Sequence, residues 1–246
     1  MNNAICIIPA RGGSVRLPRK NVKLFCNVPL IAWSIVQAKA CKYVNKVVVV
    51  TDDQEISDVS RNYGAEVIIQ PDWMKERKPH GGMAVSYALK ECLKIDPTIN
   101  IMLSMMCTNP LVLPGQLDDA FELFDRLKLE SLLPMIPLRE IVLTRRLTSF
   151  IGRTEIFSKG YEYLREGGNW GIAKVDYVLE TDYDKNTDWP DPTMDEFKPG
   201  LTNYFPVEIW QYADTDTLPE FEMAEVLMEA YILKGKGIEV YNKENK

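Results

Sequence analysis

Residues 4–21 of this chain read Ala4-Ile5-Cys6-Ile7-Ile8-Pro9-Ala10-Arg11-Gly12-Gly13-Ser14-Val15-Arg16-Leu17-Pro18-Arg19-Lys20-Asn21. The apolar residues at the start of the stretch predict a buried strand over 4–8. The strand leads into a loop with two adjacent glycines, which let backbone N–H groups approach a ligand closely. Open α/β sheets bind their ligands at the carboxyl ends of their strands. The stretch therefore predicts an α/β fold with a binding site in this loop.

The loop is basic although the protein is acidic. Residues 11–23 contain five basic side chains and no acidic one, whereas the whole chain of 246 residues has a formal net charge of −6. Because arginine and lysine donate strong hydrogen bonds to phosphate oxygens, we interpret the loop as a polyphosphate-binding site. The alternative is a solvated basic turn, which leaves the two glycines after a strand unexplained. The sequence fits neither the GxGxxG nor the Walker A pattern.

Strand-like and helix-like segments alternate along the first half of the chain. Four consecutive valines at 47–50 are typical of a central parallel strand. The alternation predicts a doubly wound α/β fold, with a mostly parallel sheet and helices on both of its faces. In the helix predicted over 29–41, we expect Gln37 and Lys39 to face solvent. The predicted strands are 4–8, 46–50, 66–70, 99–106 and 131–136, and the predicted helices are 29–41, 53–63, 83–94 and 114–129.

The second half is less regular. Residues 176–196 hold eight acidic side chains, one lysine and two prolines, which indicates an exposed arm or a long loop. A strand is expected over 203–212, followed by a helix from Leu218 to about Lys234. Thr217 and Glu220 have the spacing of a capping box at the start of this helix. We expect one domain spanning 1–246, with an arm at about 140–200.

Composition excludes several classes of protein. No apolar run approaches the roughly 20 residues that a membrane helix needs, and no signal peptide is recognisable at the N-terminus. The five cysteines are widely spaced and contain no CxxC pair, which favours reduced thiols in a cytoplasmic protein over disulfides or a zinc site. A sequence pI near 5.1 argues against general binding to nucleic acid.

Asp214-Thr215-Asp216 is a second candidate site. It follows a predicted strand and precedes the capped helix, so that two carboxylates two residues apart can point toward one ion. Hard oxygen ligands suit Mg²⁺, which also binds substrate phosphates. The alternative is that Asp216 only interacts with the positive end of the helix. A polyphosphate-binding loop elsewhere in the chain favours the metal.

Three further stretches are weaker candidates. Thr51-Asp52-Asp53 follows the valine strand, where a ligand site or a helix N-cap is expected, and we favour the cap for at least one aspartate. His80, the only histidine, lies in a turn before a helix, where pocket lining or surface exposure is favoured over a catalytic base. Residues 182–188 resemble the start of an EF-hand loop but lack its glycine, and Thr193 replaces its glutamate.

Several motifs together resemble one family. The most specific is Ile8-Pro9-Ala10-Arg11-Gly12-Gly13-Ser14 followed by Pro18-Arg19-Lys20-Asn21. They are similar to the opening signature of the acylneuraminate cytidylyltransferases, which make CMP-activated sugar acids and are related to CMP-Kdo synthetases. The resemblance covers most of residues 1–125 and 205–235. The supporting segments are Pro29–Ala32, Val50–Ile56, Tyr63–Val67, Thr108–Leu111 and Ala213–Thr217.

The resemblance implies a doubly wound fold of the nucleotidyltransferase (Rossmann-like) type, CTP and an acidic sugar as substrates, Mg²⁺ as cofactor, and a homodimer. It also implies that an arm at 140–200 helps to close the sugar site of the other subunit. Asp214 and Asp216 would hold the metal, and Asn21 and the turn around His80 would recognise cytidine. The remaining site residues that we expect are Ala10, Arg11, Gly12, Gly13, Ser14, Arg16, Lys20, Thr108 and Asn109.

The chain departs from the family pattern at two places. The lysine that usually follows Gly-Gly-Ser is Val15 here, and Arg16 is the candidate to supply the missing charge. The family's Gln-Pro-Thr-Ser-Pro-Leu-Arg element becomes 106–112 in this chain, where Met106 and Val112 replace the polar end residues. In the sialic acid enzymes those residues lie near the acceptor sugar, so an ordinary sialic acid is a doubtful substrate here.

These features favour transfer of CMP from CTP to an acidic sugar, with release of pyrophosphate. In that reaction, the acceptor hydroxyl attacks the α-phosphorus while cations and amides neutralise the phosphate charge. Two alternatives stay open. A metal-dependent glycosyltransferase would use Asp214-Thr215-Asp216 as a DxD motif for a nucleotide sugar. A nucleotide-binding homologue without activity would explain Val15.

Overall fold

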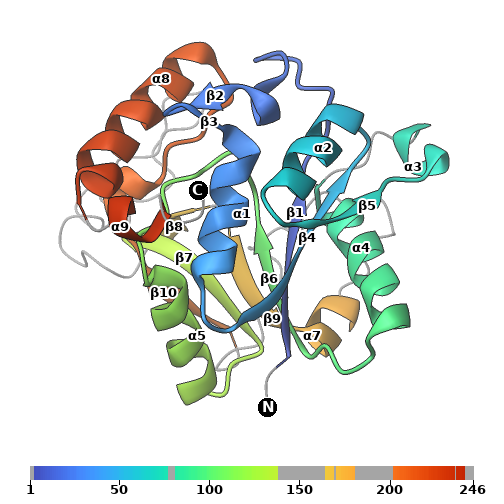
Figure 1. The fold of residues 1–246 in the computed structure, drawn as a ribbon. Helices are drawn as coiled ribbons and strands as arrows, with labels where there is room; N and C mark the ends of the chain where they lie inside the picture. The colour runs from blue at the N-terminus through green and yellow to red at the C-terminus, as the bar shows by residue number, and fades with distance from the viewer. Residues whose placement is uncertain are drawn as a thin grey trace, which may run out of the picture.

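The computed structural model describes residues 3–76, 81–137, 164–168, 170–180, 202–235 and 237–241. A twisted sheet runs through the middle of the molecule, with helices on both faces (Figure 1). Its strands follow the order β10-β7-β9-β6-β1-β4-β5, and β8 pairs with β7. The strands are β1 Ala4–Pro9, β4 Val44–Thr51, β5 Glu66–Ile69, β6 Ile101–Met105, β7 Ser131–Pro137, β8 Leu164–Glu166, β9 Trp170–Lys174 and β10 Thr202–Pro206.

The sheet is mostly parallel, as predicted. β1 pairs in parallel with β4 and β6, and the pairs β4–β5 and β7–β10 are also parallel. β9 lies antiparallel between β6 and β7, and β8 is antiparallel to β7. The α/β prediction is therefore confirmed. The sequence pattern does not predict β9, although β9 lies inside the sheet between β6 and β7, because five residues with one glycine give little periodic signal.

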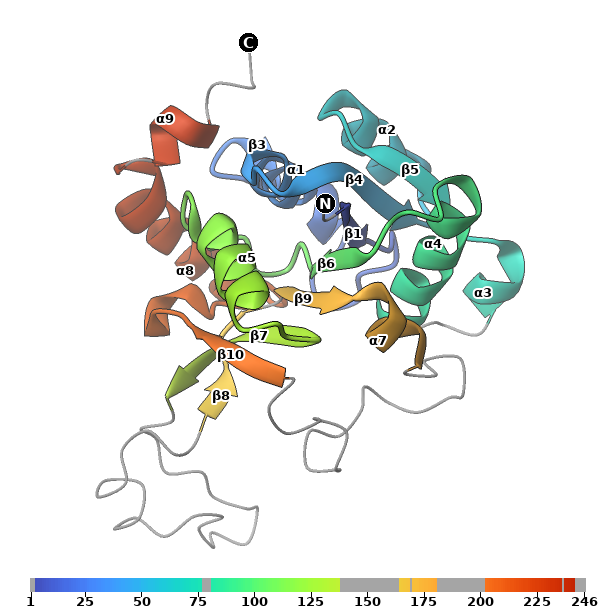
Figure 2. The ribbon, with the colours of Figure 1, turned by 90° about the horizontal axis from the view of Figure 1, so that it is seen from below.

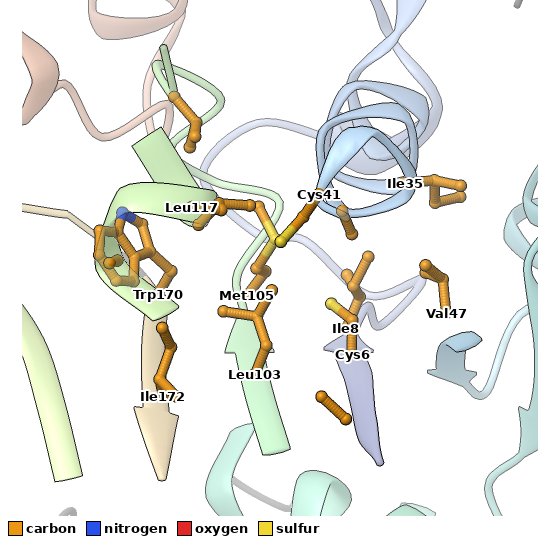
Figure 3. Packing of buried hydrophobic residues seen from close by; sticks show 14 of the residues in the cluster. Cys6, Ile8, Ile35, Cys41, Val47, Leu103, Met105, Leu117, Trp170 and Ile172 are labelled. Atoms are coloured by element: carbon orange, nitrogen blue, oxygen red, sulfur yellow. The ribbon is translucent and has the colours of Figure 1, made fainter. Parts of the chain in front are cut away.

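Helices cover both faces of the sheet (Figure 2), and two apolar layers hold them there. Apolar residues of α1, α2 and α5 pack on one face of β1, β4 and β6, and those of α3, α4 and α7 pack on the other. Figure 3 shows part of the first layer, to which β9 contributes Trp170 and Ile172. The helices are α1 Leu30–Ala40, α2 Gln54–Asn62, α3 Asp72–Glu76, α4 Gly81–Ile95, α5 Gln116–Arg126, α7 Val175–Glu180, α8 Leu218–Leu227 and α9 Gly237–Tyr241.

A third apolar cluster joins α1 to α8 and α9. Its members include Leu30 and Trp33 from α1 and Phe221 from α8, so α1 is covered on two sides. The expectation that Gln37 faces solvent is therefore wrong: Gln37 is buried, and its Nε2 donates a hydrogen bond to the carbonyl oxygen of Pro110 over 2.5 Å. Lys39 is exposed, as expected.

The second half differs from its predicted elements. The strand expected over 203–212 ends at Pro206, and the short 3₁₀ helix Ile209–Gln211 follows it. The last predicted helix is α8 with a π-helical continuation over Met228–Leu233. α7 occupies the first residues of the acidic segment 176–196, and Val178 anchors it in the core. Residues 182–188, His80 and most of the stretch assigned to an arm lie outside the described residues.

Candidate active site

The glycine loop lies at the carboxyl ends of β1 and β4 (Figure 1). The buried Ala10 continues the β1 ladder, because its N–H donates to the carbonyl oxygen of Val50 over 3.0 Å. The Gly12 N–H then donates to Asp52 Oδ1 over 2.8 Å. The N–H of Ser14 donates to the Gly12 carbonyl oxygen over 3.1 Å, which closes a tight turn. The N–H groups of Gly12 and Ser14, two of the expected site residues, thus have partners inside the protein.

Asp53 connects this loop to α2. Its Oδ1 accepts the N–H of Ile56 over 3.0 Å, so Asp53 is the N-cap of α2, and the cap predicted in this segment is confirmed. Arg19 donates to both carboxylate oxygens of Asp53 and also to Glu55. The hydrogen bond from Arg19 holds the pKa of Asp53 below its ordinary value despite partial burial. Arg19 therefore anchors the far end of the loop.

The two adjacent glycines occupy different surroundings. A Cβ atom at Gly12 would lie 2.4 Å from Asp53 Oδ2 and 2.8 Å from Asp53 Cβ. A Cβ atom at Gly13 would meet no atom within 4 Å. Gly12 is therefore required by packing against the α2 cap. Packing does not explain Gly13, which is exposed and open to a ligand.

Two of the loop cations converge on the acidic turn before α8. Lys20 Nζ donates to Asp216 Oδ1 over 2.6 Å, and the Arg16 guanidinium pairs with Asp216 Oδ2. Lys20 is only 5% exposed, whereas the Arg16 side chain is 68% exposed. Partial burial raises the pKa of Asp216, but Lys20 and Arg16 outweigh this effect and hold it below the ordinary value.

Asp214 experiences the opposite balance. Burial raises its pKa, and the neighbouring charge of Asp216 raises it further. The turn that carries both aspartates is fixed by Thr215, whose N–H and Oγ1 donate to the carbonyl oxygen of Thr108 over 3.0 and 2.9 Å. The buried Asn109 lies next in the chain. The structure thus brings the 108–109 segment to the acidic turn.

Asn21 links the loop to the segment after β6. Its Nδ2 donates to the carbonyl oxygen of Arg11 over 2.9 Å, and its Oδ1 lies 3.1 Å from the Cys107 Sγ. Burial raises the pKa of Cys107 to about 11, so this thiol is protonated and can donate to Asn21. Sequence reasoning missed Cys107, because nothing in its spacing distinguished it from a core cysteine.

The other candidates take several positions. The Arg11 side chain is exposed, and Val15 is 88% exposed. A Cβ atom at Gly81 would lie 3.1 Å from Met106 Cε and 3.8 Å from Pro9 Cγ, which places Met106 beside the end of β1. Val112 is instead a core residue, 3% exposed.

A depression of about 280 Å³ lies beside α8, lined by Cys26, Asn27, Glu222, Glu225, Val226 and Glu229.

Comparison with known proteins identifies the family to which the sequence is similar. The sequence profile of the family described as "Cytidylyltransferase" matches residues 5–145. Over 121 residues, the chain is 34% identical to pseudaminic acid cytidylyltransferase of Campylobacter jejuni, covering 49% of this chain and 52% of that enzyme. Over 63 residues, it is 48% identical to CMP-N,N'-diacetyllegionaminic acid synthase of Legionella pneumophila, covering 26% and 27%. The chain thus spans about half the length of the first of these relatives.

Solved structures share the fold. A CMP:2-keto-3-deoxy-manno-octonic acid synthetase complexed with CTP superimposes with a TM-score of 0.66 at 19% identity, covering 93% of this chain and 99% of that one. A cytidylyltransferase from Leptospira borgpetersenii gives 0.61 at 18% identity, covering 100% and 96%. The fold is therefore the one used by these nucleotidyltransferases. Because the family profile spans more than half of the sequence, the chain belongs to the cytidylyltransferase family.

Proposed function

We propose that this protein transfers CMP from CTP to an acidic sugar of the nonulosonic type and releases pyrophosphate. The observation that carries the proposal is the meeting of Arg16 and Lys20 with Asp214-Thr215-Asp216 beside a glycine loop. The named relatives that act on pseudaminic and N,N'-diacetyllegionaminic acid support this acceptor class. Such a product would serve the synthesis of cell-surface polysaccharides.

The loop would hold the triphosphate. Arg16 and Lys20 supply positive charge, and the exposed Arg11 lies at the entry of the loop. Gly13 leaves room for a phosphate oxygen, because a Cβ atom there would meet no atom within 4 Å. As the acceptor oxygen attacks the α-phosphorus and pyrophosphate leaves, negative charge grows on the phosphate oxygens, and fixed donors stabilise it without reorganisation. Thr108 and Asn109 would lie toward the substrates.

The acidic turn fits a divalent cation. Asp214 and Asp216 lie close enough for the charge of one to raise the pKa of the other, and carboxylate oxygens are the ligands that Mg²⁺ prefers. We propose that these two residues hold Mg²⁺, which neutralises phosphate charge when bound. Within the described residues, no cluster of three or more metal-ligating side chains forms, so substrate phosphates would have to complete the ligand set.

Asn21, which was expected to recognise cytidine, positions the loop in this proposal. Both polar atoms of its side chain have partners in the protein, so Asn21 positions the loop at Arg11. The turn at His80 stays a candidate for the cytidine pocket. We also propose a homodimer in the cytoplasm, with the segment at 140–200 contributing to the sugar site. No helix within the described ranges is long and apolar enough to cross a membrane.

A pyrophosphate-release screen tests the proposal. Each nucleoside triphosphate is incubated with a panel of nonulosonic and octulosonic acids and Mg²⁺. We expect release with CTP and a nonulosonic acid, and its loss in a D214N/D216N double variant that circular dichroism shows to be folded. Release of a nucleoside diphosphate from a nucleotide sugar would instead identify a glycosyltransferase. If CTP binds but no acceptor yields pyrophosphate, and V15K restores nothing, the proposed activity is wrong.

A further inference from the structure

Four charged groups of the candidate active site neutralise one another. Lys20 and Arg16 both pair with Asp216, one at each carboxylate oxygen. The charge of Lys20 also lowers the pKa of Asp214, so Lys20 lies within electrostatic reach of both aspartates. Lys20 is 5% exposed, and leaving a buried ammonium unpaired is costly. These two loop cations are thus already paired with a carboxylate of the same chain.

This arrangement conflicts with both roles in the proposed function, on which the inference below rests. A phosphate chain needs Lys20 and Arg16, but Asp216 already accepts their hydrogen bonds. A divalent cation needs Asp216, but two protein cations already neutralise it. A phosphate that binds alone to Lys20 and Arg16 leaves Asp216 unpaired, and a metal ion that binds alone to Asp216 leaves the two cations unpaired. When both ligands bind, the phosphate pairs with the two cations and the metal pairs with Asp216, so that no charge is left unpaired.

We propose that Asp216 is an internal competitor for the phosphate chain, and that metal and nucleotide bind by exchanging ion-pair partners. Lys20 and Arg16 pass from Asp216 to the phosphates as Asp216 passes to the metal. The exchange makes the binding of each ligand favour the other, and this coupling is reciprocal by thermodynamic necessity. It also disfavours the binding of an anion without metal and of a metal ion without nucleotide.

The anion arm of the test measures binding of inorganic pyrophosphate and CTP in EDTA by calorimetry. D216N releases the two cations, so we expect about 10-fold tighter metal-free binding than in the wild type. E55Q is the matched control, because it removes one carboxylate that pairs with Arg19 of the same loop but touches neither Lys20 nor Arg16. We expect E55Q to change affinity by less than about 2-fold. Repeating the comparison in high salt screens general charge effects.

The metal arm uses Mn²⁺ alone, without nucleotide. K20M keeps a side chain of similar length but removes the ammonium, so we expect Mn²⁺ to bind several-fold tighter. K23M is its control, since Lys23 is exposed and lies over the ring of Phe221. Should D216N fail to fold, the K20M arm decides the outcome.

The inference is overturned if metal-free anion affinity is unchanged or weaker in a folded D216N, or if K20M binds Mn²⁺ no better than K23M. This failure is distinct from failure of the proposed function. If the wild type releases pyrophosphate from CTP while both variants behave like their controls, only the exchange is wrong. If the wild type with Mg²⁺ neither binds CTP nor releases pyrophosphate, the proposed function is wrong.

Discussion

At the scale of single residues, adjacent positions in the glycine loop have separable roles. Gly12 has no room for a side chain, because the carboxylate of Asp53 fills that space, whereas Gly13 faces open space. The sequence pattern Arg-Gly-Gly-Ser treats the two glycines alike. The structure assigns one to packing and leaves the other available for a ligand.

This difference predicts that the same substitution affects stability at Gly12 and ligand binding at Gly13. G12A should lower the free energy of unfolding by about 1–3 kcal/mol, because the new methyl group displaces Asp53. G13A should leave stability within about 0.5 kcal/mol of the wild type but weaken CTP binding, because the methyl group obstructs the approach of a phosphate. Thermal denaturation and CTP titration of both variants measure the two effects. Equal loss of stability in both would contradict the assignment.

Asp53 predicts part of the acid sensitivity of the protein. Its pKa is lower in the folded than in the unfolded state, so its contribution to stability is present above its unfolded pKa of about 3.9 and is lost as the pH falls through its folded pKa. D53N keeps a capping side chain but cannot ionise. We expect its stability to fall less steeply than that of the wild type below about pH 4. Urea denaturation between pH 3 and 7 measures the slopes, and parallel curves would refute this contribution.

At the scale of the elements, the start of α8 fixes the acidic turn. The N–H and Oγ1 of Thr217 both donate to Glu220 Oε2 over 2.8 Å, and the predicted capping box is present. Thr217 directly follows Asp216, so the cap and the candidate active site share one turn of chain. The capped start of α8 therefore fixes the position of the Asp216 carboxylate.

Removing this cap should affect stability and activity together. T217A should lower the free energy of unfolding by about 1 kcal/mol and raise the metal concentration needed for half-maximal turnover, because Asp216 loses its fixed position. T217S retains the hydroxyl and serves as the control, with values close to the wild type. Chemical denaturation and a Mg²⁺ titration of pyrophosphate release provide the two measurements. A T217S variant as impaired as T217A would indicate that the hydroxyl is not what matters.

At the scale of the whole molecule, the core protects the thiols. All five cysteines are free, and four of them are buried. Burial raises the pKa of Cys41 to about 12 and that of Cys107 to about 11. Because the thiolate is the reactive form, the native protein should react slowly with a disulfide reagent at pH 8. Five thiols should titrate at once in denaturant without reductant, and a smaller number would reveal a disulfide.

The amino-acid sequence by itself determined the alternation of strands and helices, the basic glycine loop and the helix caps, because these depend on residues close together in the chain. The tertiary structure alone decided what depends on distant partners. The partners of Gln37 and Asn21 include Pro110 and Cys107, and β9 is a central strand only because β6 and β7 flank it. The pairing of Lys20 with Asp216 joins residues 196 positions apart. Local periodicity carries no information about such contacts, because long-range packing and charge complementarity arise only when the sheet has formed.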